Sequence, residues 1–135
     1  MSVFTPDELA YLQSQSMGRL ATVGPDGRPH IVPLTYRFNV EEDAIDLGGI
    51  DFANTKKWRD AQQNQKVTFL VDDASPKGAH AVEVRGDAEL HDTGGESINP
   101  RFSNFKPEFI RLRPYRIVSW GFGGDGRTPV GRTVG

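Results

Sequence analysis

The spacing of apolar residues changes from a helical to a strand period close to residues 17–18. Upstream, Thr5 and Glu8 stand three residues apart, as in a helix capping box, and apolar residues follow at helical spacing. Downstream, residues 18–23 alternate with a period of two and run into a Gly-Pro-Asp-Gly turn at 24–27. The pattern predicts a short N-terminal helix that ends before residue 17, followed by the first strand of a hairpin.

Further strands are indicated by apolar runs bounded by Gly, Pro, Asn and Asp. Pro29 and Pro33 lie in the first of these runs and carry no backbone N–H, so we expect them at a sheet edge or a bulge. A helix is predicted over residues 54–63, with Asn54 or Thr55 as its N-cap. The strands predicted after the first turn cover residues 29–38, 44–49, 66–72, 79–90 and 114–120.

Six strands in mainly hairpin connection, with short helices between them, predict a mainly β (α+β) fold. An antiparallel barrel or sandwich with helices at its ends fits this order of elements. Gly86 inside a long strand is expected to mark a bulge. Residues 1–135 are expected to form a single domain, in which residues 122–135 are a flexible Gly- and Arg-containing tail with too few apolar residues for a regular element.

Composition limits the chemistry that the protein itself can carry. The 135 residues include no Cys, which excludes disulfides, thiolate nucleophiles and cysteine-ligated metal centres. The three His residues have no metal-ligand spacing, and neither a dinucleotide-binding GxGxxG nor a P-loop is present. The formal charge is -2 and no apolar run is long enough to span a bilayer. We therefore expect a soluble, cytoplasmic protein that binds a small molecule and neither nucleic acid nor membrane, with no bound metal.

Charge is distributed unevenly along the chain. Residues 1–99 carry nine basic and sixteen acidic side chains, whereas residues 100–135 carry seven basic and two acidic ones. We expect an anion site to use the C-terminal part for this reason.

Thr55, Lys56 and Lys57 form the strongest candidate site in the sequence. They open the predicted helix, where backbone N–H groups, a hydroxyl and two ammonium groups can converge on a phosphate. Two lysines in a first helical turn oppose the helix dipole, and a bound anion would remove that penalty. The alternative interpretation is a solvated helix end, because lysine pairs are common on surface helices.

Five other positions are weaker candidates. Gly48 and Gly49 end a predicted strand and have no side chain to block a flat ring, or they simply form a turn. His30 is the first candidate among the histidines for acid–base work. Trp120 ends the last strand and can stack on a ring or pack in a core or interface. Arg127 lies on the tail, where it can approach an anion or remain disordered.

Five segments, taken in order, resemble the split β-barrel family of pyridoxamine-phosphate-oxidase-like proteins. They are GRLATVGPDGRPHIVPL, IDLGG, NTKKWRDAQQNQKVTFLVDD, VEVRGDAEL and RLRPYRIVSWG, and they cover about residues 17 to 121. The small size of the chain and the segments KKWRDAQ and RIVSWG are similar to the deazaflavin-dependent branch. Members of that branch use coenzyme F-420 and include reductases of tetracycline-type pathways.

The resemblance implies a six-stranded antiparallel split β-barrel of the FMN-binding type and a homodimer with the cofactor site at its interface. In the family, a basic pair binds phosphate, and it matches Lys56 and Lys57. The other positions that match or flank family cofactor contacts are His30, Val32, Pro33, Leu34, Gly48, Gly49, Asn54 and Thr55, with Trp120 and Arg127 approaching the cofactor of the partner.

The implied function is an oxidoreductase that transfers a hydride between coenzyme F-420 and a C=C or C=N bond of a small organic substrate. The proton would come from His30, Tyr36 or solvent. A phosphodiester and several glutamate carboxylates in the deazaflavin match the basic pair and the basic C-terminal part better than FMN does. The alternatives are an FMN-dependent flavoprotein of the same family and a non-catalytic cofactor-binding protein. No counterpart of the basic C-terminal substrate clamp of true pyridoxamine phosphate oxidases is found, so vitamin B6 oxidation is not expected.

Overall fold

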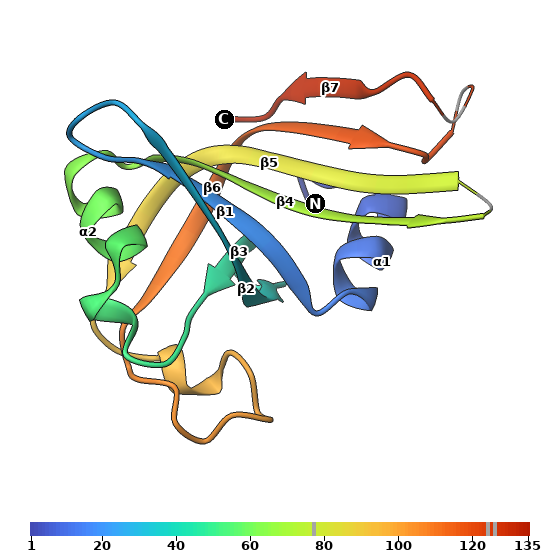
Figure 1. Ribbon diagram of the computed structural model, residues 1–135. Helices are drawn as coiled ribbons and strands as arrows, with labels where there is room; N and C mark the ends of the chain where they lie inside the picture. The colour runs from blue at the N-terminus through green and yellow to red at the C-terminus, as the bar shows by residue number, and fades with distance from the viewer. Residues whose placement is uncertain (77, 124, 126) are drawn as a thin grey trace.

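The computed structural model describes residues 1–76, 78–123, 125 and 127–135 and shows a curved sheet with two helices (Figure 1). The helices are α1 (Pro6–Ser14) and α2 (Lys56–Gln63), and two 3-10 turns are η1 (Phe52–Asn54) and η2 (Gly95–Ser97). The strands are β1 (Met17–Val23), β2 (Pro29–Asn39), β3 (Ala44–Leu47), β4 (Lys66–Ser75), β5 (Gly78–His91), β6 (Phe109–Trp120) and β7 (Val130–Thr133).

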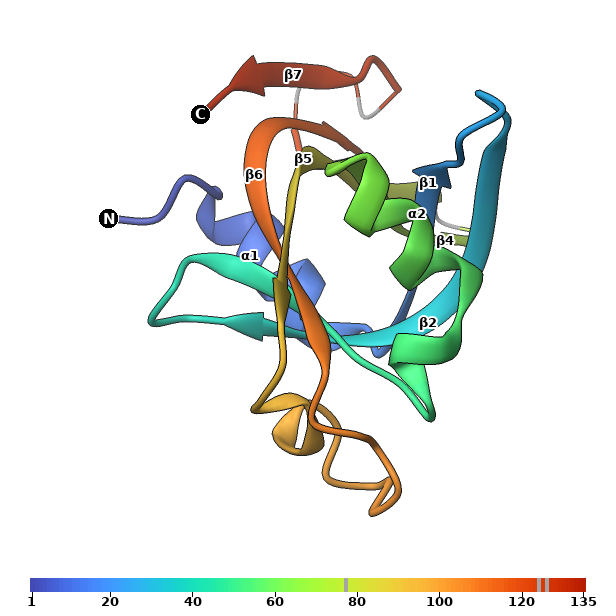
Figure 2. The same ribbon diagram turned by 90° about the vertical axis from the view of Figure 1, so that its left-hand side faces the viewer.

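Six of the strands close into an antiparallel barrel. The sheet order is β3-β2-β1-β4-β5-β6-β7, and β3 also pairs with β6, which closes the ring and leaves β7 outside it. The views in Figures 1 and 2 both place α1 and α2 on opposite sides of this barrel. The predicted mainly β, six-stranded antiparallel split-barrel fold is confirmed.

An apolar core fills the barrel. Inward positions recur at every second residue of a strand, so Leu20 of β1, Phe69 of β4, Val84 of β5 and Ile117 of β6 are fully buried together. Trp58 brings α2 into the same cluster. Apolar side chains hold both helices against the barrel, and each helix also buries one acidic side chain, Glu8 in α1 and Asp60 in α2.

Three local predictions are confirmed. Thr5 and Glu8 form the capping box, in which Thr5 Oγ1 accepts from Glu8 N at 3.2 Å and Glu8 Oε1 accepts from Thr5 N at 2.9 Å. Pro29 and Pro33 lie at a sheet edge, because within the described chain β3 pairs with residues 36–39 of β2 and not with these positions. The register of β5 against β6 shifts at Gly86, as expected for a bulge.

Two predictions about the C-terminal third are wrong. The last barrel strand was predicted over residues 114–120, but β6 begins at Phe109. The segment after residue 121 was predicted to hold no regular element, but β7 pairs with β6 from Val130 to Thr133. β6 offers an open edge of backbone N–H and C=O groups, and pairing with it requires no apolar side chain.

An ion pair joins β7 to the N-terminal helix. The Arg132 guanidinium donates to both carboxylate oxygens of Glu8, at 2.6 and 3.0 Å, and to the carbonyl oxygen of Val3 at 2.6 Å. Glu8 is only 1% exposed, so its charge is compensated almost entirely by this contact and the capping box.

Other C-terminal cations are used in the same way. Arg111 Nε donates to the fully buried Asp46 at 2.9 Å, and Arg113 pairs with Glu42 at 2.6 Å and with Glu89 at 2.8 Å. These pairs connect β6 to β3, to β5 and to the β2–β3 turn. Three of the six C-terminal arginines, Arg111, Arg113 and Arg132, are thus engaged in ion pairs inside the fold, which a charge count cannot distinguish from ligand binding. The expected anion site in this part of the chain stays a prediction for the others.

Candidate functional site

α2 begins where the sequence predicted an anion site, and Thr55 is its N-cap. Thr55 Oγ1 accepts from Trp58 N at 3.3 Å and donates to Phe52 O at 2.7 Å. Asn54, the alternative cap, is exposed and donates to Asp51 Oδ1 at 2.8 Å. The Thr55 hydroxyl proton is thus already used in a hydrogen bond. The donors that remain for a bound anion are the first-turn backbone N–H groups and the lysine ammonium groups.

Lys56 is held by a carboxylate from its own helix. Its Nζ lies 3.1 and 3.2 Å from the two oxygens of Asp60, which is 3% exposed and also accepts from Thr22 Oγ1 of β1 at 3.0 Å. A Cβ at position 24 would lie 3.1 Å from Lys56 Nζ, so Gly24 leaves room for this pair at the start of the β1–β2 turn. The ion pair also explains how α2 tolerates a lysine at its positive end.

Lys57 has a different environment. Its Nζ lies 5.2 Å from the centre of the Phe52 ring, and it forms no ion pair with a carboxylate in the described part of the chain. Burial of the half-buried side chain lowers the pKa of the Lys57 ammonium. A partly desolvated cation without a counter-ion at a helix N-terminus fits an anionic ligand group, since the anion would restore its lost hydration.

β2 carries four of the predicted cofactor positions on its two faces. His30, Val32 and Leu34 point toward the barrel, and Leu34 is buried in its core. Pro33 faces outward, where it lines a hollow of about 290 Å³ with Arg19, Ile31 and Val32. His30 lies directly across from Thr22 in the β1–β2 ladder, and therefore beside the Lys56–Asp60 pair.

Tyr36 is not placed for proton transfer to a ligand, and its candidacy is withdrawn. It is 8% exposed, and its hydroxyl donates to the carbonyl oxygen of Leu12 in α1 at 2.5 Å. Burial raises the pKa of this hydroxyl. Its role is to hold α1 against β2.

Gly48 and Gly49 contact the loop before β6. A Cβ on Gly48 would lie 2.8 Å from Ile98 Cδ1, and Gly49 O accepts from Lys106 N at 3.5 Å. Ile98 belongs to a second small apolar cluster with Phe105 and Phe109. The absence of a side chain at Gly48 therefore allows Ile98 to pack closely against the backbone of Gly48. Contact of either glycine with a cofactor stays a prediction.

Trp120 and Arg127 come together on the outer face of the sheet. They line a hollow of about 600 Å³ with Leu70 and with small residues of β5 that include Ala79 and Ala81. Ala81 pairs with Trp120 across β5 and β6 and leaves open space next to the ring. The end of β6 that carries Trp120 lies on the far side of the barrel from α2 (Figure 1). Within one chain, the predicted site residues at α2 and those at the Trp120 hollow are therefore far apart.

Comparison with known proteins decides the family. A family model described as pyridoxamine 5'-phosphate oxidase matches residues 4–111. The chain belongs to the pyridoxamine 5'-phosphate oxidase family. It is 40% identical over 130 residues to the 5a,11a-dehydrotetracycline/5a,11a-dehydrooxytetracycline reductase of Streptomyces rimosus subsp. rimosus, with 94% of this chain and 89% of that protein covered. This relative supports an oxidoreductase activity for the chain.

Solved structures share the fold at lower identity. A conserved hypothetical protein from Mycobacterium tuberculosis superposes with a TM-score of 0.67 at 22% identity, over 92% of this chain and 95% of that one. The FAD binding protein from Mycobacterium smegmatis superposes with a TM-score of 0.62 at 23% identity, over 88% and 96% of the two chains. Membership of the pyridoxamine 5'-phosphate oxidase family points to a flavin-type cofactor. Neither helix of the described chain has the length and apolar character of a membrane-spanning helix.

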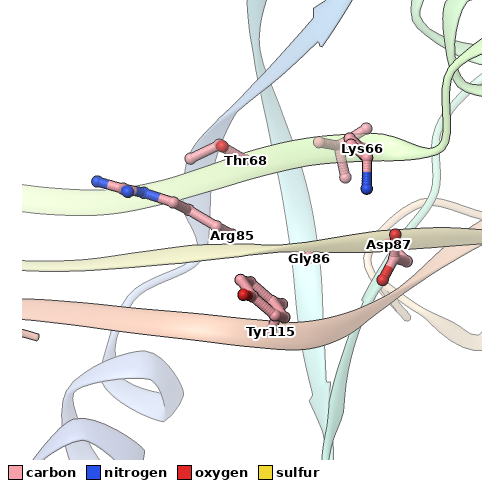
Figure 3. Close-up of a pocket in the computed structure, with 7 residues that line it drawn as sticks. Lys66, Thr68, Arg85, Gly86, Asp87 and Tyr115 are labelled. Carbon is pink, nitrogen blue, oxygen red and sulfur yellow. The ribbon is translucent and has the colours of Figure 1, made fainter. Parts of the chain in front are cut away.

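A further hollow in this member of the pyridoxamine 5'-phosphate oxidase family was not anticipated. Figure 3 shows it over the β-bulge, between Lys66 of β4, Arg85 and Asp87 of β5 and Tyr115 of β6, with a volume of about 310 Å³. A Cβ at Gly86 would lie 2.0 Å from Arg113 O, which explains why a glycine occupies the bulge. The predicted bulge was the only signal for this hollow in the sequence. The hollow is lined by both basic and acidic side chains, and we assign it no ligand.

Proposed function

We propose that this protein is an F-420-dependent reductase that transfers a hydride to an electron-poor C=C or C=N bond of a small organic substrate. The observation that carries the proposal is the 40% identity, over nearly the whole chain, to a reductase of two dehydro compounds. Reduction of a dehydro compound adds a hydride and a proton across a double bond. Amino-acid side chains do not donate hydride, so a bound cofactor must provide it.

The residues at α2 fit the anionic part of such a cofactor. Lys57 is half-buried without an ion pair in the described chain, and Lys56 keeps its ammonium partly exposed beside it, with 49% of its side chain accessible. We assign phosphate binding to these two ammonium groups and to the first-turn N–H groups of α2. When bound, a reduced deazaflavin would supply the hydride.

The chain positions the ring and the substrate. The outward residues Ile31 and Pro33 of β2 offer an apolar surface, and Pro33 presents no N–H to a ring laid against it. His30 precedes Ile31 in β2 but points toward the barrel, beside the Lys56–Asp60 pair, and not onto this outward surface. We propose solvent, or the His30 imidazole for a substrate that reaches past the edge of β2, as the source of the proton delivered to the reduced bond. Orientation of substrate against cofactor would supply most of the rate enhancement.

A second copy of the chain would complete the site. Lys56 and Lys57 lie at one end of the barrel, and Trp120 and Arg127 line the hollow at the other. If both groups contact one cofactor, they must come from two chains. We propose a homodimer in which the Trp120 hollow of one protomer approaches the α2 site of its partner.

An FMN-dependent reaction is the second candidate. It is favoured by the family model, which describes pyridoxamine 5'-phosphate oxidase. The two cofactors present different anionic groups to the protein. FMN carries a phosphate monoester, whereas the deazaflavin carries a phosphodiester and glutamate carboxylates. This difference can be tested on the same α2 residues.

The proposed activity is tested by anaerobic turnover. Purified protein is mixed with reduced F-420 and a panel of α,β-unsaturated ketones and cyclic imines, and cofactor oxidation is followed by its absorbance. We expect oxidation that requires both protein and substrate, with the saturated product found by mass spectrometry. Oxidation with reduced FMN alone would support the second candidate, and cofactor binding without turnover would indicate a cofactor-binding protein.

A further inference from the structure

Asp60 is the one acidic group that contacts the proposed phosphate-binding lysines among the residues that the structure describes. Its carboxylate accepts from Lys56 Nζ at 3.1 and 3.2 Å and from Thr22 Oγ1 at 3.0 Å, and it is 3% exposed. Burial alone would raise the pKa of Asp60, but hydrogen bonds from Lys56 and Thr22 outweigh burial and lower it. The carboxylate is therefore ionised at neutral pH.

This contact changes the charge that a ligand meets at α2. Lys56 and Lys57 together would present two positive charges, whereas the three side chains together present one. An anion on Lys56 also lies within about one Debye length, roughly 8 Å at physiological salt, of Asp60. Each additional negative charge on the ligand is thus attracted by the lysines and repelled by a fixed carboxylate.

We propose that Asp60 is a specificity-determining residue, which reduces the advantage that a phosphate monoester with two negative charges has over a phosphodiester with one at the α2 lysines. The inference rests on the proposed function, since it assumes that the cofactor phosphate binds at Lys56 and Lys57. Asp60 acts through Lys56 without touching the cofactor, and it discriminates only between the two phosphate groups.

A purely structural role of Asp60 makes a different prediction. Asp60 joins α2 to β1 through Thr22, so its loss can loosen the helix and weaken every ligand equally. Asn at this position keeps an oxygen that can accept from Thr22 and removes the charge. A charge effect must change the ratio of the two affinities, whereas loosening of the helix must not.

The test compares dissociation constants for oxidised F-420 and for FMN at pH 8, where the FMN monoester is a dianion. Asp60→Asn is expected to tighten FMN relative to F-420 by about tenfold, the size expected for one unit charge interacting at an intermediate dielectric. Asp92→Asn, at an exposed position after β5, makes the same change in net charge and is expected to leave the ratio unchanged. Raising the salt concentration should reduce the effect of Asp60→Asn.

A second variant guards against misfolding of the first. Lys56→Gln removes a cation whose side chain is about half-exposed, so it should fold, and it is expected to move the ratio the other way, against FMN, by a similar factor. Melting temperatures of all variants without cofactor are measured alongside. A ratio that stays constant in both Asp60→Asn and Lys56→Gln would overturn the inference, while F-420 binding by the unmodified protein would leave the proposed function standing. If the unmodified protein binds neither cofactor, the proposed function itself fails.

Discussion

Neighbouring residues of α2 have different environments, and the difference follows from their partners. Lys56 is balanced by Asp60, whereas Lys57 is half-buried over Phe52 without a carboxylate in the described chain. The sequence predicted a helix that begins with the lysine pair and has Asn54 or Thr55 as its cap, because these features depend on local spacing. It could not predict that the Thr55 hydroxyl is used by Phe52 or that Tyr36 is bound to Leu12, because those contacts depend on how distant segments meet.

Lys57→Ala tests the ligand role at the residue scale. We expect it to weaken F-420 binding by about 1–3 kcal/mol, the range for a charge-assisted hydrogen bond. The melting temperature without cofactor should stay nearly unchanged, because the ammonium has no ion pair to lose among the residues that the structure describes. Fluorescence titration and thermal unfolding measure both effects, with Lys66→Ala as a control lysine outside α2. A large fall in melting temperature would instead show a structural role.

Tyr36→Phe tests the structural role assigned to that hydroxyl. Its removal leaves the Leu12 carbonyl oxygen without its buried donor, so unfolding free energy should fall by about 1–2 kcal/mol. Cofactor affinity and turnover should be unchanged. Chemical denaturation and the turnover assay are sufficient, and a loss of turnover at unchanged stability would restore Tyr36 as a proton donor.

At the scale of elements, β7 shows where sequence patterns stop being informative. Helices and hairpins near the N-terminus were predicted because caps, turns and alternation are encoded within a few residues. β7 has almost no apolar pattern, and it is held by the edge of β6 and by the contact of Arg132 with Glu8. The two partners of that contact lie 124 positions apart, so no local signal exists for it.

Arg132→Ala is expected to destabilise the fold by about 2 kcal/mol, less than the 3–5 kcal/mol typical when a fully buried pair is broken. The expected loss of unfolding free energy is smaller because the Arg132 side chain is 32% exposed. A loss is still expected because the variant leaves the Glu8 carboxylate buried without its counter-charge. Denaturant unfolding measures the change. Arg116→Ala, at the same edge but hydrogen-bonded only to Thr133 Oγ1 in the described chain, should cost much less. Equal losses in the two variants would contradict the importance of the Glu8 contact.

The same ion pair has a predicted pH dependence. Burial acts to raise the pKa of Glu8, but hydrogen bonds from Arg132 and from Thr5 N outweigh it and hold the pKa below the ordinary value of 4.5. The folded state therefore binds protons less readily than the unfolded one, and this stabilisation is present above pH 4.5 and lost as the pH falls through the lowered pKa. The stability difference between the unmodified protein and Glu8→Gln should shrink as the pH falls below 4.5, in urea unfolding at a series of pH values. A constant difference would contradict the assignment.

The whole molecule places its candidate residues at two ends of one barrel. The sequence resemblance implies that Trp120 and Arg127 approach the cofactor of the partner in a homodimer, but no pattern in one chain shows that they lie apart from the α2 lysines within it. In the structure of one chain, the Trp120 hollow and α2 lie on different sides of the barrel. The proposed homodimer of the 14.9 kDa chain follows from that separation.

Subunit mixing tests the two-chain site. Lys57→Ala and Trp120→Ala are each expected to bind F-420 weakly, but co-expressed chains form mixed dimers in which one site has both residues. With random pairing, about a quarter of the sites should regain full affinity, because half of the dimers are mixed and each has one intact site. Titration of the co-expressed sample measures that fraction. No recovery would show that each site is built from one chain.

The most direct test of the account is a parallel titration of the purified protein with F-420 and with FMN, followed by cofactor fluorescence and by thermal shift. F-420 is expected to bind saturably, to raise the melting temperature, to bind less tightly at high salt and to bind more tightly than FMN. Tight FMN binding with no response to F-420 would contradict it.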